Sequence, residues 1–211
     1  MKKDQIMISL YYFPFSQHSR RVISLIEEAG LEYQANLVDM MQGEHYSEAY
    51  LAINPNHQVP SLVDEDICLS ESHAIMRYLC NKHQLSDWYP TDIVKKAHVD
   101  QWLDWNHCRL GPVVKDIVFN LLFAEKAGIP VDQNAIIKGK ESLIELTNLL
   151  EKQLNTSSYL ATDQISIADL ALASNIFHLS MANCAPSSPA IEAWYDKISM
   201  LKGFQKSLPK M

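Results

Sequence analysis

The sequence predicts two domains, a mixed α+β domain followed by an all-α domain. Apolar residues alternate with a period of two in several stretches before residue 70, which is typical of strands. After residue 92 they recur at helical spacing almost throughout. Between these parts, the segment LSDWYPTD interrupts both patterns with Pro90. We therefore predict an N-terminal domain at residues 1–84, a linker at 85–92 and an all-helical domain at 93–211.

The N-terminal domain is predicted to run βαβ and then ββα. Residues 6–12 alternate as a strand, residues 20–29 show helical spacing, and residues 31–37 alternate again. Strands joined by such a helix pair in parallel through a right-handed crossover. The short apolar runs in residues 61–69 predict a hairpin, followed by a helix with Ser70 as its N-cap. The expected result is a mixed sheet with helices on it.

The second half is predicted to consist of about five helices. The first, at residues 93–124, is expected to kink at Gly111-Pro112, because proline cannot continue the backbone hydrogen bonds of a helix. Ser166 and Asp169 have the spacing of a capping box and mark another helix start. The remaining predicted helices lie at residues 132–154 and after Ser188-Pro189.

The composition excludes several classes of partner. A formal net charge of −7 argues against nucleic acid, whose affinity comes largely from Lys and Arg contacts to phosphates. No segment approaches the ~20 apolar residues that span a bilayer, so we expect no membrane partner and a cytoplasmic location. The cysteines are widely spaced and the histidines are scattered, which favours reduced structural thiols and gives a metal site little support. The cysteines are Cys68, Cys80, Cys108 and Cys184.

Pro60, in the stretch NPNHQVPSL, stands at the entrance of a predicted strand. Proline cannot extend a central ladder, and a cis bond before it is usually a deliberate feature. A cis bond here would turn the N–H and C=O of Val59 toward an open face, where they could pair with an extended peptide. The alternative is an ordinary trans proline in a loop.

Glu71 and Ser72 fall in the first turn of a predicted helix. Unpaired backbone N–H groups favour anions there. A ligand with both a carboxylate and an ammonium group could place the first on Ser72 and the second near Glu71, which fits the α-amino-acid end of a γ-glutamyl peptide. The alternative is that the glutamate merely complements the helix dipole.

Ser16 lies between the first strand and the first helix, in SQHSR. A thioredoxin-like sheet would carry a redox Cys-x-x-Cys at this turn, whereas this chain has Ser-x-x-Ser. Lowering a thiol pKa from ~8.5 by two units requires about 2.7 kcal/mol. A hydrogen bond to a charged sulfur contributes ~1.5–3 kcal/mol, and a helix N-terminus adds ~0.3–1 kcal/mol. Ser16 could therefore stabilise a ligand thiolate, unless it serves only as a helix cap.

These motifs together resemble a cytosolic glutathione S-transferase of the theta and delta type that uses serine. Four segments in order carry the resemblance over nearly the whole chain: YYFPFSQHSRRV, GEHYSEAYLAINPNHQVPSLVDEDICLSESHAI, WYPTD and SIADLALA. The resemblance implies the glutathione transferase fold. Its thioredoxin-like domain carries the glutathione site, and its all-α domain supplies much of the electrophile pocket.

The resemblance also implies roles for individual residues. Ser16 is expected to stabilise the glutathione thiolate, and Tyr12 is its rival because Tyr12-Phe13-Pro14 resembles tyrosine-type members. We favour Ser16 because the residues that follow it suit the serine type. His73 stands where delta members often have Arg. The positions implied to bind glutathione are His45, His57, Gln58, Val59, Pro60, Glu71, Ser72 and His73.

The predicted helical domain adds fewer candidates. Asp100 matches a position that can reach the glutathione of a neighbouring subunit, although it could be a solvated helix acid. Phe15, Trp105 and Arg109 could line the electrophile pocket. A tryptophan at helical spacing can equally belong to the core, and an arginine can bind an acidic neighbour.

The resemblance implies a glutathione transferase that attacks small hydrophobic electrophiles in detoxification, with glutathione as co-substrate and no metal. Peroxidase or dehalogenase side activity is compatible with the same thiolate, and a homodimer is expected. The alternative is a non-catalytic glutathione- or protein-binding module on the same fold. A disulfide reductase is disfavoured, because no cysteine falls at the active turn.

Overall fold

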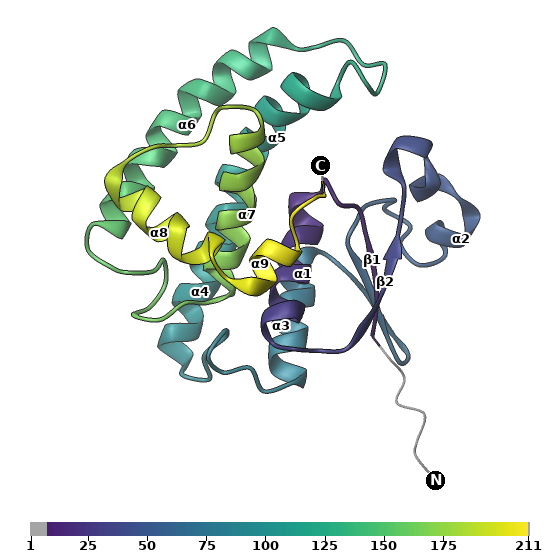
Figure 1. Ribbon diagram of the computed structural model, residues 1–211, viewed down its shortest axis with the longest axis horizontal. Helices are drawn as coiled ribbons and strands as arrows, with labels where there is room; N and C mark the ends of the chain where they lie inside the picture. The colour runs from purple at the N-terminus through teal and green to yellow at the C-terminus, as the bar shows by residue number, and fades with distance from the viewer. Residues whose placement is uncertain (1–7, 211) are drawn as a thin grey trace. The chain divides into compact units, whose positions relative to one another are not determined.

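The computed structural model describes residues 8–210, which form two compact units (Figure 1). The first unit comprises the described residues up to Leu85 together with those from Leu201 onward, and the second is Ser86–Met200. Within residues 8–210, no helix is both long and apolar enough to cross a membrane.

The first unit is built on a four-stranded mixed sheet in the order β2–β1–β3–β4. β1 pairs in parallel with β2, from Ile8 opposite Tyr33 to Tyr12 opposite Leu37. β3 is antiparallel to both β1 and β4. The strands are β1 (Ile8–Tyr12), β2 (Tyr33–Leu37), β3 (Ser61–Asp64) and β4 (Ile67–Ser70). The predicted βαβ unit and hairpin are confirmed, apart from the first two residues of the predicted 6–12 strand, which lie outside the described part.

Two longer helices cover this sheet, α1 (Gln17–Glu28) and α3 (Ser72–Lys82). α1 buries Val22, Leu25 and Ile26 completely, because their spacing puts them on one face. Both helices begin elsewhere than predicted. α1 starts at Gln17 rather than residue 20, since Ser16 caps it, and the N-cap of α3 is Glu71 rather than Ser70. The shorter helices are η1 (Met40–Gln42), η2 (Glu44–Tyr46), α2 (Glu48–Leu51) and α9 (Lys202–Lys206).

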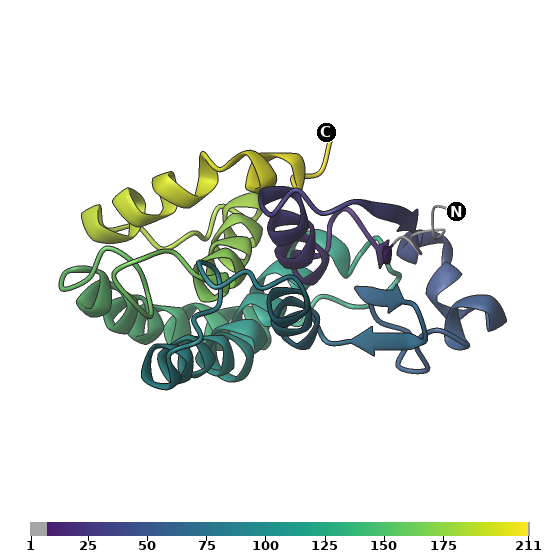
Figure 2. The same cartoon turned by 90° about the horizontal axis from the view of Figure 1, so that it is seen from below.

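The C-terminal helix α9 packs against α1, although the sequence assigned residues 201–211 to the helical domain (Figures 1 and 2). Gly203 makes this possible: a Cβ there would lie 2.5 Å from the carbonyl oxygen of Ser24 and 2.7 Å from the backbone nitrogen of Glu28. The Gly203 N–H donates to the Glu28 carboxylate, and the Ser24 hydroxyl donates to Ser207 at 2.9 Å. Backbone contact of this kind cannot be foreseen from apolar spacing, which is why the prediction placed the segment elsewhere.

Gly203→Ala is expected to lower the free energy of unfolding of the first unit by about 1–3 kcal/mol, because the added methyl group overlaps the α1 backbone. Burial raises the pKa of the Cys80 thiol in this unit to about 12, so it reacts only after unfolding. Cys80 labelling across a urea series, read by peptide mass spectrometry, measures the effect. Lys202→Ala, at an exposed position of α9, is the control. Equal midpoints for the two variants would show that α9 does not dock as described.

The second unit consists of helices, as predicted. The long first stretch is divided into α4 (Ile93–Trp105), the π-helical turn η3 (Asn106–Leu110), α5 (Gly111–Val118) and the π-helical turn η4 (Phe119–Phe123). The predicted kink at Gly111-Pro112 is therefore taken up by a π turn, in which the Gly111 N–H donates to the Asn106 carbonyl. Widening the helix here accommodates a proline ring that would clash with the preceding turn. The remaining helices are α6 (Gln133–Leu154), α7 (Ile167–Met181) and α8 (Pro189–Ser199).

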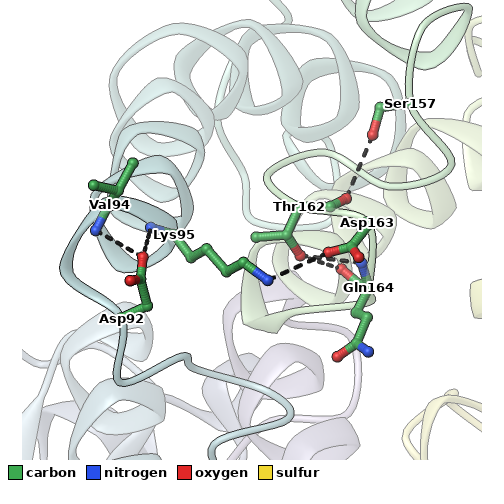
Figure 3. Close-up of polar contacts among 7 residues, drawn as sticks. All are labelled: Asp92, Val94, Lys95, Ser157, Thr162, Asp163 and Gln164. Atoms are coloured by element: carbon green, nitrogen blue, oxygen red, sulfur yellow. Dashed lines mark hydrogen bonds and ion pairs between the residues drawn. The ribbon is translucent and has the colours of Figure 1, made fainter.

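Asp92 caps α4, and Lys95 in the first turn of this helix reaches the loop before α7 (Figure 3). The Asp92 carboxylate accepts the N–H groups of Val94 at 3.1 Å and Lys95 at 2.9 Å. The Lys95 ammonium lies 3.7 Å from the Asp163 carboxylate, a solvent-exposed pair that contributes little to stability. Trp88 lies within the predicted linker. Its backbone carbonyl accepts the N–H of Ile167 at 2.9 Å, so this segment is hydrogen-bonded to the start of α7 in the second unit.

The predicted capping box at the start of α7 is confirmed. The buried Asp169 carboxylate accepts the Ser166 N–H at 2.8 Å and the Ser166 hydroxyl at 2.9 Å. It also accepts the Leu160 N–H at 3.0 Å and the Trp194 indole N–H at 2.9 Å. One carboxylate thus ties the loop before α7 to α8. Ser188 caps α8 with Pro189 in its first turn, as predicted.

Candidate functional site

Ser16 is half-buried at the corner between β1 and α1. Its hydroxyl oxygen accepts the N–H of Ser19 at 3.2 Å, and its own N–H donates to the Phe13 carbonyl at 3.0 Å. Within residues 8–210 no acceptor takes the proton of the Ser16 hydroxyl. Capping uses a lone pair of the oxygen and leaves the O–H able to donate, so the two predicted roles of this serine are compatible.

The rival residue, Tyr12, ends β1 and is half-buried. Burial, followed by Glu27 and then Tyr12, raises the pKa of Tyr33 to about 12, and the Tyr33 hydroxyl donates to Glu27 at 3.1 Å. Glu27 lies in the last turn of α1, at the opposite end from Ser16. The Tyr12 carbonyl accepts the Val38 N–H at 2.9 Å, and no hydrogen bond within residues 8–210 uses the Tyr12 phenol.

The loop before β3 presents Val59. The Val59-Pro60 bond is cis, as expected from the sequence. Gln58 is exposed, and its carbonyl accepts the Tyr50 hydroxyl at 2.5 Å and the Asn54 amide at 2.8 Å, two supports that the sequence did not reveal. Val59 is only 6% exposed, yet no hydrogen bond within residues 8–210 uses its N–H or C=O. Buried backbone groups are nearly always paired, so these two are suited to an extended ligand.

The first turn of α3 carries Glu71 and Ser72. Glu71 is exposed and has φ 69°, ψ 108°, a left-handed backbone conformation that costs a non-glycine residue ~1–3 kcal/mol. Such strain clusters at ligand sites. Ser72 is buried, and its hydroxyl accepts a hydrogen bond from Arg21 at 3.3 Å. The Ser72 hydroxyl proton and N–H have no acceptor within the described residues, so both can donate to an anion.

Arg21 joins α1 to α3 and was not recognised in the sequence. It is 1% exposed, and its Nη1 lies 3.0 Å from His18 Nδ1 and 3.2 Å from His73 Nε2, besides Ser72. Burial, then Arg20, lowers the pKa of Arg21 to about 9, and Glu71 partly offsets this, so the side chain is cationic at neutral pH. In the sequence, Arg20 and Arg21 look like exposed basic residues on the polar face of an amphipathic helix. Only the structure shows that both side chains are buried.

His45 and His57 are brought together, with Tyr46 between them. The ring of Tyr46 lies 4.0 Å from that of His45 and 4.9 Å from that of His57, and the two imidazoles are 6.3 Å apart. Burial, and then His57, lowers the pKa of His45. Its Nδ1 is buried without a partner among the described residues, so this ring can still accept or donate a hydrogen bond.

These elements are held together within the first unit. Phe13, just before Ser16, packs against a small core of Val38, Tyr50 and Val59. Arg21 connects the helix that Ser16 caps to Ser72. The serine corner, the cis-proline loop and the N-terminus of α3 are thus joined by direct packing and hydrogen bonds.

The other predicted residues have local partners. Phe15 is 36% exposed, with its ring 5.8 Å from that of Phe13. In the second unit, Asp100 accepts the Tyr89 hydroxyl at 3.0 Å, Trp105 packs edge-on against Trp102, and Arg109 is exposed in η3. No cluster of three or more potential metal-ligating side chains occurs among the residues that the structure describes.

The fold defines a class of protein in which a thioredoxin-like domain, here carrying a serine corner, unpaired backbone groups and a helix N-terminus, is followed by a helical domain. Two family models match the chain, "Glutathione S-transferase, N-terminal domain" over residues 7–81 and "Glutathione S-transferase, C-terminal domain" over residues 113–201. The chain belongs to the glutathione S-transferase family, as its resemblance predicted.

Individual relatives support this assignment. The chain is 35% identical to glutathione S-transferase F10 of Arabidopsis thaliana over 92% of this chain and 93% of that protein. It is 30% identical to glutathione S-transferase theta-1 of Homo sapiens over 93% of this chain and 84% of that protein. The crystal structure of glutathione transferase F7 from Populus trichocarpa superposes with a TM-score of 0.88 at 30% identity, covering 95% of this chain and 97% of that one. The predicted fold and the likeness to theta members are confirmed.

Proposed function

We propose that this glutathione transferase activates glutathione through Ser16, whose hydroxyl donates a hydrogen bond to the thiolate. The observation that supports this most directly is that Ser16 caps α1 through its oxygen and keeps its O–H available. The Ser19 N–H polarises this hydroxyl, since a hydroxyl that accepts one hydrogen bond becomes a better donor. The N-terminus of α1 adds a positive potential at the same place. Tyr12, which ends β1 four residues before Ser16, is the rival group.

The groups around Ser16 are assigned to the remaining parts of the glutathione tripeptide. The unpaired N–H and C=O of Val59, before Pro60, would pair with the cysteinyl backbone. Ser72 and its N–H would bind the γ-glutamyl carboxylate, with Glu71 near the ammonium group and His73 behind. His45, His57 and Gln58 would reach the glycine end. The unpaired backbone of Val59 and the Ser72 hydroxyl proton and N–H support these assignments most directly.

Several finer assignments stay proposals. The thiolate would attack small hydrophobic electrophiles in a detoxifying conjugation, and Phe15, Trp105 and Arg109 would contribute to the electrophile pocket. We also propose a cytoplasmic homodimer, in which Asp100 would reach the glutathione of the neighbouring subunit. These rest on the family and on the sequence motifs.

Glutathione titrated into the protein in a calorimeter is expected to bind. The ultraviolet absorbance of the bound thiolate, followed against pH, should then give a thiol pKa about two units below ~8.5, because one charged hydrogen bond and a helix N-terminus contribute that much. Conjugation to a chromogenic aryl halide completes the test. Binding with an unshifted thiol pKa and no conjugation would indicate a non-catalytic glutathione-binding module, and absence of binding would overturn the proposal.

A further inference from the structure

We propose that Ser19 is a positioning residue that fixes the Ser16 hydroxyl in the orientation that the glutathione thiolate requires. The inference rests on the function proposed above, in which Ser16 donates to that thiolate. It gives a role to the second serine of the Ser-x-x-Ser turn, which the proposed function does not otherwise use. Because Ser19 is 0% exposed, it acts through Ser16 and does not itself touch the ligand.

Three hydrogen bonds join the residue after β1 to the first turn of α1. The Ser16 N–H donates to the Phe13 carbonyl at 3.0 Å, and the Ser19 N–H donates to Ser16 Oγ at 3.2 Å. The Phe13 N–H in turn donates to Ser19 Oγ at 3.3 Å. Each of the three residues therefore donates once and accepts once, and the hydrogen bonds form a closed ring. The Ser19 hydroxyl is the part of this ring that a substitution can remove.

The closed ring limits where the Ser16 oxygen can lie. Rotation of the Ser16 side chain would break its hydrogen bond from the Ser19 N–H. The bond from the Phe13 N–H holds Ser19 itself against the end of the strand, and the Phe13 side chain packs against the small core that contains Val59. Ser16 is thereby fixed relative to the loop that would pair with the cysteinyl backbone. Orientation matters here, because a hydrogen bond weakens steeply when its angle is poor.

Ser19 does not behave as an ordinary helix serine. A serine inside a helix often donates to the carbonyl four residues earlier, as Ser24 does to Arg20 at 2.7 Å. At the third helical position, where Ser19 lies, a capping box uses a side chain that accepts the N–H of the N-cap residue. Here the Ser16 N–H already donates to Phe13, and Ser19 accepts the Phe13 N–H instead. Ser19 therefore stabilises the turn that carries Ser16, beyond the helix alone.

The experiment separates the thiol from the peptide that carries it. Ultraviolet absorbance against pH gives the thiol pKa of bound glutathione, and calorimetry measures the affinity for S-methylglutathione, which has no thiol proton to lose. Ser19→Ala is expected to raise the thiol pKa by about half a unit to one unit, the effect of one neutral hydrogen bond. Its affinity for S-methylglutathione should stay within about twofold of native, because the peptide contacts are unchanged.

The pH dependence of conjugation gives a second measure of the same effect. With a chromogenic aryl halide and saturating glutathione, the rate of Ser19→Ala at pH 6 should be about threefold to eightfold below native, because less of the bound thiol is ionised. At pH 9 the two rates should be nearly equal, since both enzymes then hold the thiolate.

Matched variants separate the hydroxyl from packing. Ser24→Ala removes an equally buried serine of the same helix and should leave the thiol pKa native. Ser19→Thr keeps the acceptor oxygen, whereas Ser19→Val has nearly the same shape without it, so the difference between these two reports the oxygen even if Ser19→Ala does not fold. We expect a near-native thiol pKa in Ser19→Thr and a raised one in Ser19→Val.

A double variant tests whether Ser19 acts through Ser16. In a Ser16→Ala background, Ser19→Ala should cause no further rise of the thiol pKa, because the hydroxyl that it orients is already gone. A rise of the same size in both backgrounds would show that Ser19 acts by another route, and it would overturn the proposal.

The remaining outcomes are distinguishable. A native thiol pKa in Ser19→Ala, or an equal rise in Ser24→Ala, would overturn the positioning role while leaving thiolate formation by the native enzyme intact. Weaker binding of S-methylglutathione with a native thiol pKa would show that Ser19 only supports the fold of the site. If the native enzyme bound glutathione without lowering its thiol pKa, the proposed function would fail, and this inference with it.

Discussion

Ser16→Ala is expected to raise the thiol pKa of bound glutathione by about two units and to lower kcat/KM at neutral pH by about 100-fold. The alanine removes a half-buried hydroxyl that caps α1 through its oxygen and whose proton has no acceptor within residues 8–210. The lost hydrogen bond to a charged sulfur is worth ~1.5–3 kcal/mol, and each 1.36 kcal/mol is tenfold in rate. The pH dependence of thiolate absorbance and of the conjugation rate measures both effects.

The substitution also removes a helix cap, which costs ~1 kcal/mol of stability. Ser16→Gly separates the two effects, because glycine replaces a serine cap at a cost of only a few tenths of a kcal/mol but has no hydroxyl. It should lose the thiolate as completely as Ser16→Ala while remaining more stable. Ser16→Thr should retain both functions in part. A loss of thiolate in Tyr12→Phe with normal behaviour in Ser16→Gly would assign the role to Tyr12 instead.

Asp169→Ala is expected to lower the free energy of unfolding of the second unit by more than about 3 kcal/mol, because it leaves four buried donors without an acceptor. Burial raises the pKa of this carboxyl, and the four donors offset that cost. All four tryptophans of the chain, at positions 88, 102, 105 and 194, lie in the second unit, so tryptophan fluorescence in a urea series reports on it.

A second capping aspartate provides the control. Asp92 also caps a helix of the second unit but is exposed, so Asp92→Ala should cost only ~1 kcal/mol. Equal effects of the two substitutions would mean that the contacts of Asp169 with Leu160 and Trp194 add nothing to the cap. Asp169→Asn, which keeps one acceptor, should fall between them.

The sequence was most informative where a structure is stabilised by residues close along the chain. The capping box of Ser166 and Asp169, the cap at Ser188 and the alternation of the strands each depend on groups a few residues apart. The cis bond at Pro60 and the helix cap at Ser16 likewise depend on residues that are close along the chain. Helix starts were less secure: Ser70 is the better N-cap residue, but it is the last residue of β4, and α3 begins one position later, after Glu71, which makes no side-chain cap hydrogen bond.

The sequence predicted which residues belong to the candidate site, but not the hydrogen bonds and packing contacts that join them. Arg21 lies 51 positions from the Ser72 hydroxyl that it donates to. The unpaired backbone of Val59 and the positive φ of Glu71 are properties of three-dimensional packing that residue types do not encode. Tyr50 and Asn54 support the loop through its Gln58 carbonyl, a group that every residue possesses.

Sequence alone therefore determined the family and the order of the elements, because these follow from local periodicity and from motifs, and it predicted which side chains contact a thiol and two carboxylates. Tertiary structure decided that α9 closes against α1, with Ser24 and Ser207 hydrogen-bonded across 183 positions. It also decided that a buried cation stands behind the first turn of α3. Burial and long-range contact arise only when distant segments pack together, and they determine which polar groups are already paired and which remain able to bind a ligand.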